Sequence, residues 1–221
     1  MIAEILPDGV VAVEARGDPA DIVLFPEEEA ALGEAVDKRR REFATARACA
    51  RAALARLGLP ALPIPADARG EPRWPAGVVG SITHCHGYRA CAVGRASEMV
   101  TIGIDAEPNA PLPEGVLAEI ARAEELPRLR ELARIAPAVH WDRLLFSAKE
   151  SVYKAWFPLA RRWLGFEDAV LAIDPLQGSF AARLLIPGPR LAGGRLTTLS
   201  GRWLVRDGLV LTAIALESQD S

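Results

Sequence analysis

The sequence has little cysteine and few aromatic residues. Of 221 residues, three are cysteines, and Phe, Trp and Tyr together make up 6%. Three is an odd number and no disulfide pattern is present, which argues against a disulfide-stapled secreted domain and favours a reducing cytoplasm. We interpret Cys49, Cys85 and Cys91 as small apolar residues of the core rather than as catalytic thiols.

Long hydrophobic runs are also lacking. Arg, Asp or Gly interrupts the apolar stretches well short of the roughly 20 residues that a membrane-spanning helix needs. No basic segment precedes an apolar one at the N-terminus, so we expect no signal peptide. An excess of positive charge is absent too: the net charge is −3, which argues against a generally nucleic-acid-binding surface. Half of the residues are apolar, which indicates a globular chain of one large or two small domains.

Periodicity predicts a mixture of helices and strands. We expect helices at residues 26–57, 114–135 and 140–157, with Gly58 and Pro60 ending the first one. Strands are predicted at 10–15, 21–25, 78–84, 88–94, 100–107, 169–174, 179–186, 201–206 and 209–216. The Asp207-Gly208 pair between the last two strands is a strong hairpin signal.

The first candidate for chemistry is "TIGIDAEP" at residues 101–108. Side chains alternate faces along a strand, so Asp105 and Glu107 point the same way while Ile102 and Ile104 face a core. Two neighbouring carboxylates repel each other and favour a cation beside them. The alternative is a strand end with two solvated acids.

The second candidate is "FSAKESVYKAWF" at residues 146–157. Glu150 and Lys154 are four residues apart, which also suits an ordinary ion pair on a helix surface. Aromatic residues cover much of this helix, however, and indicate that its charges are partly desolvated: Phe146, Tyr153, Trp156 and Phe157. Together with Asp105 and Glu107, Glu150 would supply three carboxylates from two elements, a set that suits Mg²⁺.

Two further segments offer partners for phosphate. In "GSITHCHG" at residues 80–87, hydroxyl groups and His84 are suitable hydrogen-bond donors. A zinc site of His84, Cys85 and His86 is the alternative, but three consecutive residues do not converge easily on one ion. Seven Lys and Arg residues lie between residues 38 and 56, either as a solvated helix face or as a binding face for several phosphates. The combination fits a polyphosphate ligand bound with a divalent cation.

At this point the motifs resemble a known family. "GSITH", "GIDAE" and "FSAKESVYKAWF" together resemble the three signature segments of the 4′-phosphopantetheinyl transferases. The similarity is to the surfactin-synthetase-activating and enterobactin-type class, and most closely to its actinobacterial members. Segments such as "RRREFATARACARAAL" and "RRWLGFED" extend the similarity from about residue 39 to residue 216.

The resemblance implies an α/β (α+β) fold of two similar halves related by a pseudo-twofold axis, with the active site at their interface. We place the halves at residues 1–108 and 109–221. It also implies a holo-[acyl-carrier-protein] synthase activity. Such an enzyme transfers the 4′-phosphopantetheine arm of coenzyme A to a serine of an apo carrier protein, uses Mg²⁺ or Mn²⁺, and releases adenosine 3′,5′-bisphosphate.

Site residues follow from the same resemblance. The implied metal ligands are Asp105, Glu107 and Glu150, with Ala106 as a backbone ligand in place of a side chain. The implied coenzyme A contacts are Arg39, Arg47, Thr83, His84, Lys149 and Lys154. Ala66 stands where a lysine near the 3′-phosphate is expected, and Arg69 is the candidate substitute. Glu150, directly or through a metal-bound water, is the candidate base, and Lys154 and Asp105 complete the catalytic set.

The implied partners are acyl and peptidyl carrier proteins of fatty-acid, polyketide and nonribosomal-peptide synthesis, siderophore synthesis included. We expect a cytoplasmic monomer with no nucleic-acid or membrane partner. A metal-dependent hydrolase of coenzyme A-like diphosphates shares the same metal chemistry and remains an alternative. A non-catalytic coenzyme A-binding module and a nucleic-acid binder that uses the arginine helix are the other two.

Overall fold

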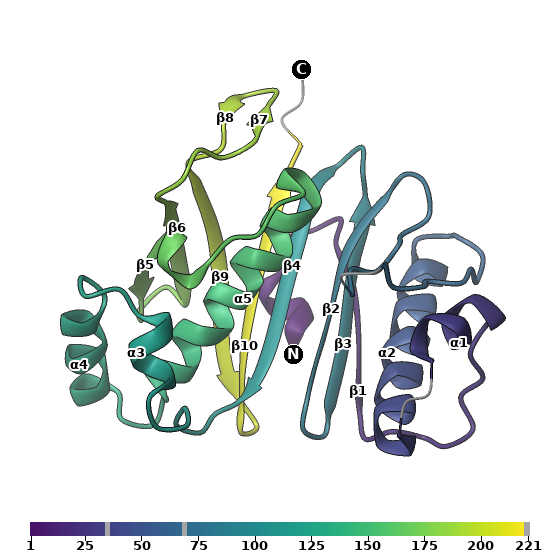
Figure 1. The fold of residues 1–221 in the computed structure, drawn as a ribbon, viewed down its shortest axis with the longest axis horizontal. Helices are drawn as coiled ribbons and strands as arrows, with labels where there is room; N and C mark the ends of the chain where they lie inside the picture. Colours follow the sequence, from purple (N-terminus) through teal and green to yellow (C-terminus); the bar gives the residue numbers. More distant parts are fainter. Residues whose placement is uncertain (34–35, 68–69, 219–221) are drawn as a thin grey trace.

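Two antiparallel sheets stand side by side in the computed structural model, which describes residues 1–33, 36–67 and 70–218 (Figure 1). The first sheet has the strand order β1-β3-β2, and the second has the order β4-β10-β9-β6-β5. The strands of these sheets are β1 (Val11–Arg16), β2 (Val78–Cys85), β3 (Tyr88–Arg95), β4 (Met99–Pro108), β5 (Ala169–Asp174), β6 (Ser179–Leu184), β9 (Thr198–Arg206) and β10 (Leu209–Glu217). A small pair, β7 (Arg190–Leu191) with β8 (Gly194–Arg195), lies apart from both sheets.

Each sheet packs against one long helix, α2 (Asp37–Arg56) or α5 (Trp141–Ala160). The other helical segments are η1 (Ile2–Ile5), α1 (Pro26–Leu32), α3 (Val116–Ile120), α4 (Leu126–Ile135) and η2 (Phe166–Asp168). The predicted mixed α+β class is confirmed. Among the described residues, no helix is both long and apolar enough to cross a bilayer.

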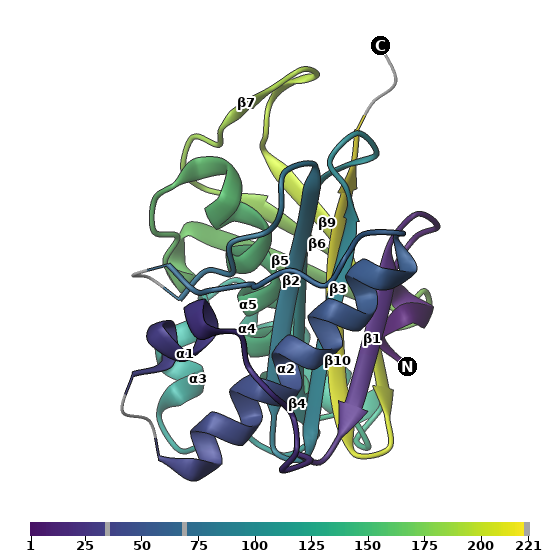
Figure 2. The same ribbon diagram turned by 90° about the vertical axis from the view of Figure 1, so that its right-hand side faces the viewer.

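Helix α2 covers one face of the three-stranded sheet, with α1 beyond it (Figure 2). Its alanine-rich face is buried as predicted, since Ala46, Ala50, Ala53 and Leu54 are at most 2% exposed. Small side chains let the helix approach the sheet closely, and Cys49 and Cys91 fill the space between them. These cysteines are free and buried, which agrees with their interpretation as core residues.

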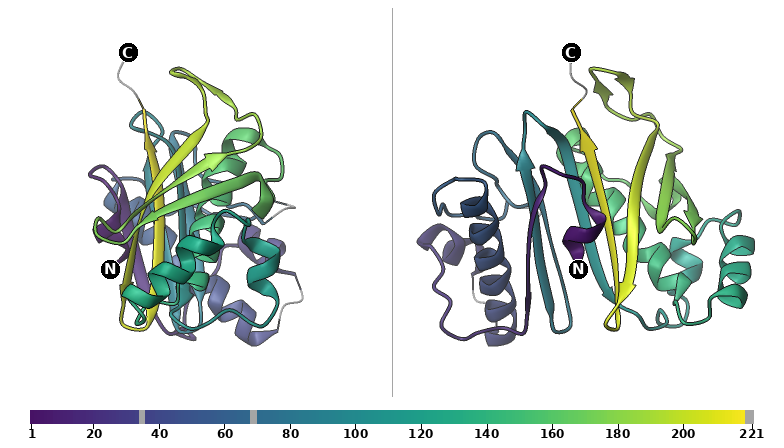
Figure 3. Two further views of the ribbon diagram at one scale, coloured as in Figure 1. Left: turned by 90° about the vertical axis from the view of Figure 1, so that its left-hand side faces the viewer. Right: turned by 180° about the vertical axis from the view of Figure 1, so that it is seen from behind.

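The second sheet has a core on both faces. On one side, α5 contributes Leu144, Leu145, Val152 and Trp156, none more than 1% exposed, to the largest apolar cluster. On the other side, η1 lies against the junction of the two sheets, as the view from behind shows (Figure 3). Strand β4 is therefore buried from both faces, and Ile102 and Ile104 are fully buried as predicted.

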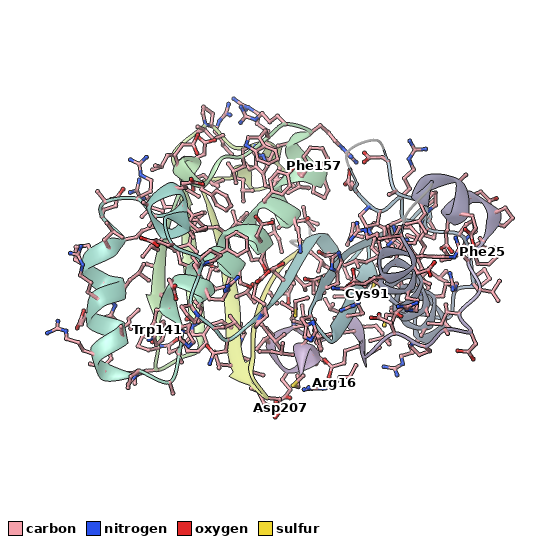
Figure 4. The ribbon with its side chains drawn as sticks, turned by 60° about the horizontal axis from the view of Figure 1, so that its bottom comes forward. Arg16, Phe25, Cys91, Trp141, Phe157 and Asp207 are labelled. Carbon is pink, nitrogen blue, oxygen red and sulfur yellow. The ribbon has the colours of Figure 1, made fainter. Side chains whose placement is uncertain are left out.

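The predicted hairpin is confirmed between β9 and β10. Asp207 and Gly208 have φ values of 52° and 74°, the left-handed conformation that a tight hairpin turn requires at both positions. The carboxylate of Asp207 accepts a hydrogen bond from Arg16 at 3.0 Å, so the turn is tied to the end of β1 (Figure 4). The hairpin sets β10 against β4 with Thr212 opposite Asp105.

Several predicted elements differ in the structure. The helix expected at 26–57 is divided, because α1 ends at Gly33, which has a φ of 61°. The helix expected at 114–135 is divided into α3 and α4, with Pro127 in the first turn of α4. The strand expected at 21–25 is wrong, since this segment has no strand partner. Its Phe25 N–H instead donates to the Glu28 carboxylate at 3.0 Å and begins α1.

Strand β4 is hydrogen-bonded into the second sheet, with strands that come later in the chain. It pairs with β10 over its whole length, although it lies inside the predicted first half, residues 1–108. The division after Pro108 stays a prediction. What the pairing shows is that β4 forms the edge of the second sheet and faces β2, the edge of the first.

Candidate active site

Side-chain hydroxyls join the two sheets where β2 runs beside β4. Ser81 Oγ accepts a hydrogen bond from the Ile104 N–H at 3.1 Å, and Thr83 Oγ1 accepts one from the Ala106 N–H at 3.0 Å. These hydroxyls take the place of a backbone ladder between the sheets, and they satisfy N–H groups that would otherwise be buried without a partner. We call this junction the β2–β4 seam.

Asp105 lies at the seam with one oxygen engaged. Its Oδ1 accepts hydrogen bonds from Thr83 Oγ1 at 3.2 Å and from Lys154 Nζ at 2.7 Å. Its Oδ2 is buried and has no hydrogen-bond partner among the described residues. An unpaired carboxylate oxygen in a buried position is costly, and a cation is the kind of partner that relieves the cost.

Glu107 and Glu150 complete the set of predicted acids. Burial raises the pKa of each carboxyl, and the charge of Asp105 raises both pKa values further. The alternation predicted that Glu107 and Asp105 point the same way from β4. In the structure Glu107 pairs with Arg143 of α5 at 2.9 Å. Among the residues described, no three acidic, histidine or cysteine side chains are arranged to share one metal ion. The oxygen donors suit Mg²⁺, and their mutual repulsion is the condition that a divalent cation relieves.

Helix α5 brings its charges to β4 because it lies unusually close to the strand. A Cβ atom added to Gly103 would lie 2.2 Å from the Ser151 carbonyl oxygen and 2.7 Å from the Ala155 nitrogen, so only glycine fits there. Buried hydroxyls fix the helix in this position. Thr212 Oγ1 lies 2.7 Å from Ser151 Oγ, and Thr101 Oγ1 donates to the Ala155 carbonyl at 2.8 Å.

Lys154 meets Asp105 rather than Glu150. Its ammonium group donates to Asp105 Oδ1 and, at 3.1 Å, to the Ile104 carbonyl. The ion pairs among the described residues include none between Glu150 and Lys154, so the alternative of an ordinary pair along the helix surface is wrong. The two charges lie on the same side of α5, and both line the same cavity.

The predicted phosphate contact of Lys149 stays a prediction, and in the structure the Lys149 side chain has partners from the protein itself. Its ammonium pairs with Glu125 at 2.9 Å and also donates to three carbonyls, those of Ile120, Phe166 and Ala169. The side chain is only 3% exposed. A helix turns by about 100° per residue, so Lys149 and Lys154, five residues apart, point about 140° apart. Lys149 therefore faces the second half of the protein.

A cavity of about 460 Å³, which we call the main cavity because several of the predicted site residues line it, lies between α2 and α5. Its walls come from α1, α2, loop residues 66, 67 and 70–72, β2 and α5. The predicted residues that line it are Arg39, Arg47, Ala66, His84, Glu150 and Lys154. Arg69 lies outside the described residues. Ala66 forms an isolated bridge with Pro72 in the loop that borders the cavity.

Positive charge gathers on the α2 side of this cavity. Arg39 Nη1 lies 3.1 Å from His84 Nε2, so the arginine donates and this imidazole nitrogen accepts. Partial desolvation lowers the pKa of His84, and the charges of Arg39 and Lys154 lower it further. Burial also lowers the pKa of Arg47 to about 10, which leaves it a cation at neutral pH.

A smaller cavity of about 100 Å³ adjoins the main one across Glu150 and Tyr153, which line both. Tyr153 packs against Trp163 with ring centroids 4.8 Å apart, and Trp163 is 71% exposed. Phe166 and Leu164 add apolar surface. Most of its lining is apolar, with Lys149 and Glu150 as the charged residues, in contrast to the cationic cavity beside it.

Sequence reasoning missed several residues of the site. Arg143 and Ser147 share one side of α5 with Glu150 and Lys154, and the spacing i, i+4, i+7 and i+11 could have identified them. Ser81 was noted only as a member of a donor-rich segment. Its role as a bridge to β4 depends on two strands that are not neighbours in the sequence. No local pattern predicts that bridge.

Comparison with known proteins identifies the family. Residues 27–94 match the 4′-phosphopantetheinyl transferase N-terminal domain, and residues 101–196 match the 4′-phosphopantetheinyl transferase superfamily. The chain is 56% identical over 219 residues to 4′-phosphopantetheinyl transferase Svp of Streptomyces mobaraensis, covering 98% of this chain and 89% of that protein. It is 49% identical over 226 residues to PptT of Mycobacterium tuberculosis, covering 98% of each. It is 50% identical over 224 residues to Npt of Nocardia iowensis, covering 97% and 99%. The chain therefore belongs to the 4′-phosphopantetheinyl transferase superfamily, enzymes that move the 4′-phosphopantetheine arm of coenzyme A onto carrier proteins.

Proposed function

We propose that the main cavity holds the nucleotide and diphosphate end of coenzyme A. Arg39, Arg47 and Lys154 supply fixed positive charge along its walls, and His84 supplies a neutral imidazole. Guanidinium groups bind phosphate through paired hydrogen bonds, and a closed cationic cleft strengthens such contacts. The observation that carries the proposal is the position of Asp105. A buried carboxylate with one oxygen unpartnered is bonded to Lys154, which lines this cationic cavity.

Asp105, Glu107 and Glu150 are the proposed ligands of a divalent cation, Mg²⁺ or Mn²⁺. All are oxygen donors, and the three carboxyls already influence one another electrostatically. The backbone C=O of Ala106 is the alternative ligand to the Glu107 carboxylate. The Ala106 N–H points to the β2–β4 seam, and the C=O of the same strand residue points to the same edge. When bound, such an ion neutralises the charge of the diphosphate oxygens.

The remaining steps fall to groups of this chain. Lys154 holds Asp105 and places a positive charge beside the diphosphate. Thr83 fixes the Asp105 carboxylate and the β4 backbone at once. Glu150 borders both cavities, so it lies where the carrier serine must approach, and we assign it the role of taking the serine proton, directly or through a water.

The smaller aromatic cavity is the proposed site of the pantetheine arm. It continues from the cationic cavity past Glu150, which matches the order of charged and uncharged parts in coenzyme A. The exposed ring of Trp163 packs against Tyr153 at an interplanar angle of 52° and offers apolar surface to the chain. This placement puts the bond to be broken at the boundary between the two cavities.

The carrier proteins are proposed to be acyl and peptidyl carriers of fatty-acid, polyketide and nonribosomal-peptide synthesis. The relatives of similar length are named only for their transferase activity. A relative 29% identical over 202 residues is an enterobactin synthase component of Salmonella typhimurium, which supports a carrier of siderophore synthesis among the candidates. A cytoplasmic monomer remains the prediction from the sequence.

One assay separates transfer from the two alternatives. The protein is incubated with coenzyme A, MgCl₂ and a panel of apo carrier proteins, and each carrier is analysed by intact mass spectrometry. Transfer adds one phosphopantetheine to the carrier and releases adenosine 3′,5′-bisphosphate. Free phosphopantetheine in the absence of a carrier would indicate a hydrolase, and coenzyme A binding without any product would indicate a binding module.

A further inference from the structure

A buried carboxylate outside the acidic site links three segments of the first half. Glu28 is 0% exposed, and each of its partners comes from a different part of the chain. Its Oε1 accepts the Ile64 N–H at 3.0 Å, while its Oε2 accepts the Phe25 N–H at 3.0 Å and Arg51 Nη1 at 2.8 Å. A carboxylate so removed from water is tolerated only where hydrogen bonds and an opposite charge replace its hydration.

The three segments that Glu28 joins are three walls of the main cavity. Phe25 begins α1, whose Ala31 and Leu32 line the cavity (Figure 4). Arg51 lies on α2, one turn after the lining residue Arg47. Ile64 comes two residues before Ala66, which lines the cavity from the loop. Glu28 itself is not among the lining residues.

The same network directs Arg47. The Ile64 carbonyl accepts a hydrogen bond from Arg47 Nε at 2.6 Å, so Glu28 and Arg47 hold the two main-chain groups of one residue. Glu28 pairs with Arg51 and leaves the two terminal nitrogens of Arg47 without a hydrogen-bond partner among the described residues. The Arg47 guanidinium stacks 4.1 Å from the Phe43 ring centroid, at the cavity wall.

We propose that Glu28 is a positioning residue for coenzyme A binding. By joining α1, α2 and the loop at residue 64, it sets the spacing of the cavity walls and aims Arg47 into the cavity. Its effect passes through Arg47 and the Ile64 backbone, without contact with the substrate. The inference rests on the proposed placement of the nucleotide end in this cavity.

The test is Glu28→Gln, which keeps the shape but replaces one acceptor by a donor. Whichever way the amide is turned, its NH₂ group faces another donor, either the Ile64 N–H or the Phe25 N–H and Arg51. Hydrogen bonds between the segments are therefore lost. We expect the KM for coenzyme A to rise about tenfold, as is usual for residues that orient ligand-binding groups, with kcat within about twofold and the KM for the carrier protein unchanged. Isothermal titration with coenzyme A should show an equal loss of affinity.

Glu14→Gln is the matched control, because Glu14 is another carboxylate of the same half with three partners: the N-terminal amine, the Ile2 N–H and the Tyr88 hydroxyl. It does not line the main cavity. A change that acts only through folding lowers the melting temperature in both variants and leaves both KM values unchanged. That result, or a fall in kcat at constant KM for Glu28→Gln, would overturn the inference.

Two further variants keep the result decisive. If Glu28→Gln does not fold, Arg51→Gln replaces it, because this change removes the cation that pairs with Glu28 from a partly exposed position. The inference survives only if Arg51→Gln raises the KM for coenzyme A about threefold or more. Arg47→Ala tests the premise. Unchanged coenzyme A affinity in Arg47→Ala contradicts the placement of the nucleotide end. Weakened affinity there together with normal affinity in Glu28→Gln contradicts only the role of Glu28.

Discussion

Gly103→Ala is the change that tests how the site is assembled. The new Cβ would lie 2.2 Å from the Ser151 carbonyl oxygen, 2.7 Å from the Ala155 nitrogen and 3.0 Å from its Cβ. An ordinary carbon–oxygen contact is about 3.4 Å, so α5 must withdraw from β4 by about 1 Å. Both neighbours are backbone atoms in the middle of a helix, and they move only if the helix moves.

The expected loss of activity follows from that displacement. Lys154 Nζ now lies 2.7 Å from Asp105 Oδ1, and a shift of about 1 Å takes the pair beyond hydrogen-bond distance. Glu150 moves with the same helix. A displacement of this size in catalytic groups reduces turnover about 100-fold, equivalent to about 2.7 kcal/mol of transition-state stabilisation. Overpacking lowers the free energy of unfolding by about 1–3 kcal/mol in addition.

The assay measures kcat and both KM values by intact mass of a carrier protein, with urea unfolding for stability. Gly201→Ala is the matched control. A Cβ at Gly201 would lie 2.3 Å from Phe180 Cζ and 2.6 Å from the Ala213 carbonyl, a comparable clash in the same sheet that does not touch α5. If both variants lose similar stability and Gly103→Ala keeps kcat within about threefold of the wild type, the close approach of α5 does not set the site.

Three other changes have defined outcomes. Asp105→Asn should abolish Mg²⁺-dependent transfer while the fold is kept, and substantial transfer that still rises with added Mg²⁺ would contradict the metal assignment. Lys149→Met leaves Glu125 buried without its cation and should lower the free energy of unfolding, measured in urea, by about 3–5 kcal/mol. Adding Glu125→Leu to the same chain should recover part of the loss. A change under about 1 kcal/mol in Lys149→Met would refute the buried pair. Glu14→Gln should lower the melting temperature at pH 7 by an amount that shrinks in acid. Burial opposes ionisation of Glu14, but its hydrogen bonds and the N-terminal amine outweigh burial and lower its pKa below the ordinary 4.5. The contribution of ionised Glu14 to stability is therefore complete above pH 4.5 and is lost as the pH falls through the lowered pKa. A difference in melting temperature that does not depend on pH would contradict this.

Local patterns predicted most of the elements of the fold. Short apolar segments bounded by turn residues identified β2, β3 and β4, and the Asp207-Gly208 pair identified the last hairpin. The same rules failed at residues 21–25, where the apolar run has no strand beside it. A run of apolar residues is necessary for a strand, but pairing is a property of the whole sheet, and Glu28 captures the Phe25 N–H instead.

The candidate site was predicted as a set of residues better than as an arrangement. Asp105, Glu150 and Lys154 were identified from motifs; Asp105 pairs with Lys154, and the charges of both act on the Glu150 carboxyl. Lys149 was assigned to a phosphate because its neighbours in sequence are site residues, whereas its partners in the structure are Glu125 and carbonyls 17 to 29 positions away. The pairing of Glu107 with Arg143 likewise spans 36 positions and leaves no trace in the letters around either residue.

The β2–β4 seam contains two amide groups whose hydrogen exchange reports the separation of the two sheets. Strand β4 is joined to β10 by a continuous ladder of backbone hydrogen bonds. On its other edge, the N–H groups of Ile104 and Ala106 depend on two side-chain hydroxyls of the other sheet. When the sheets part, these two protons are the first of the strand to meet solvent. Their exchange rate therefore registers how often the β2–β4 seam separates, independently of global unfolding.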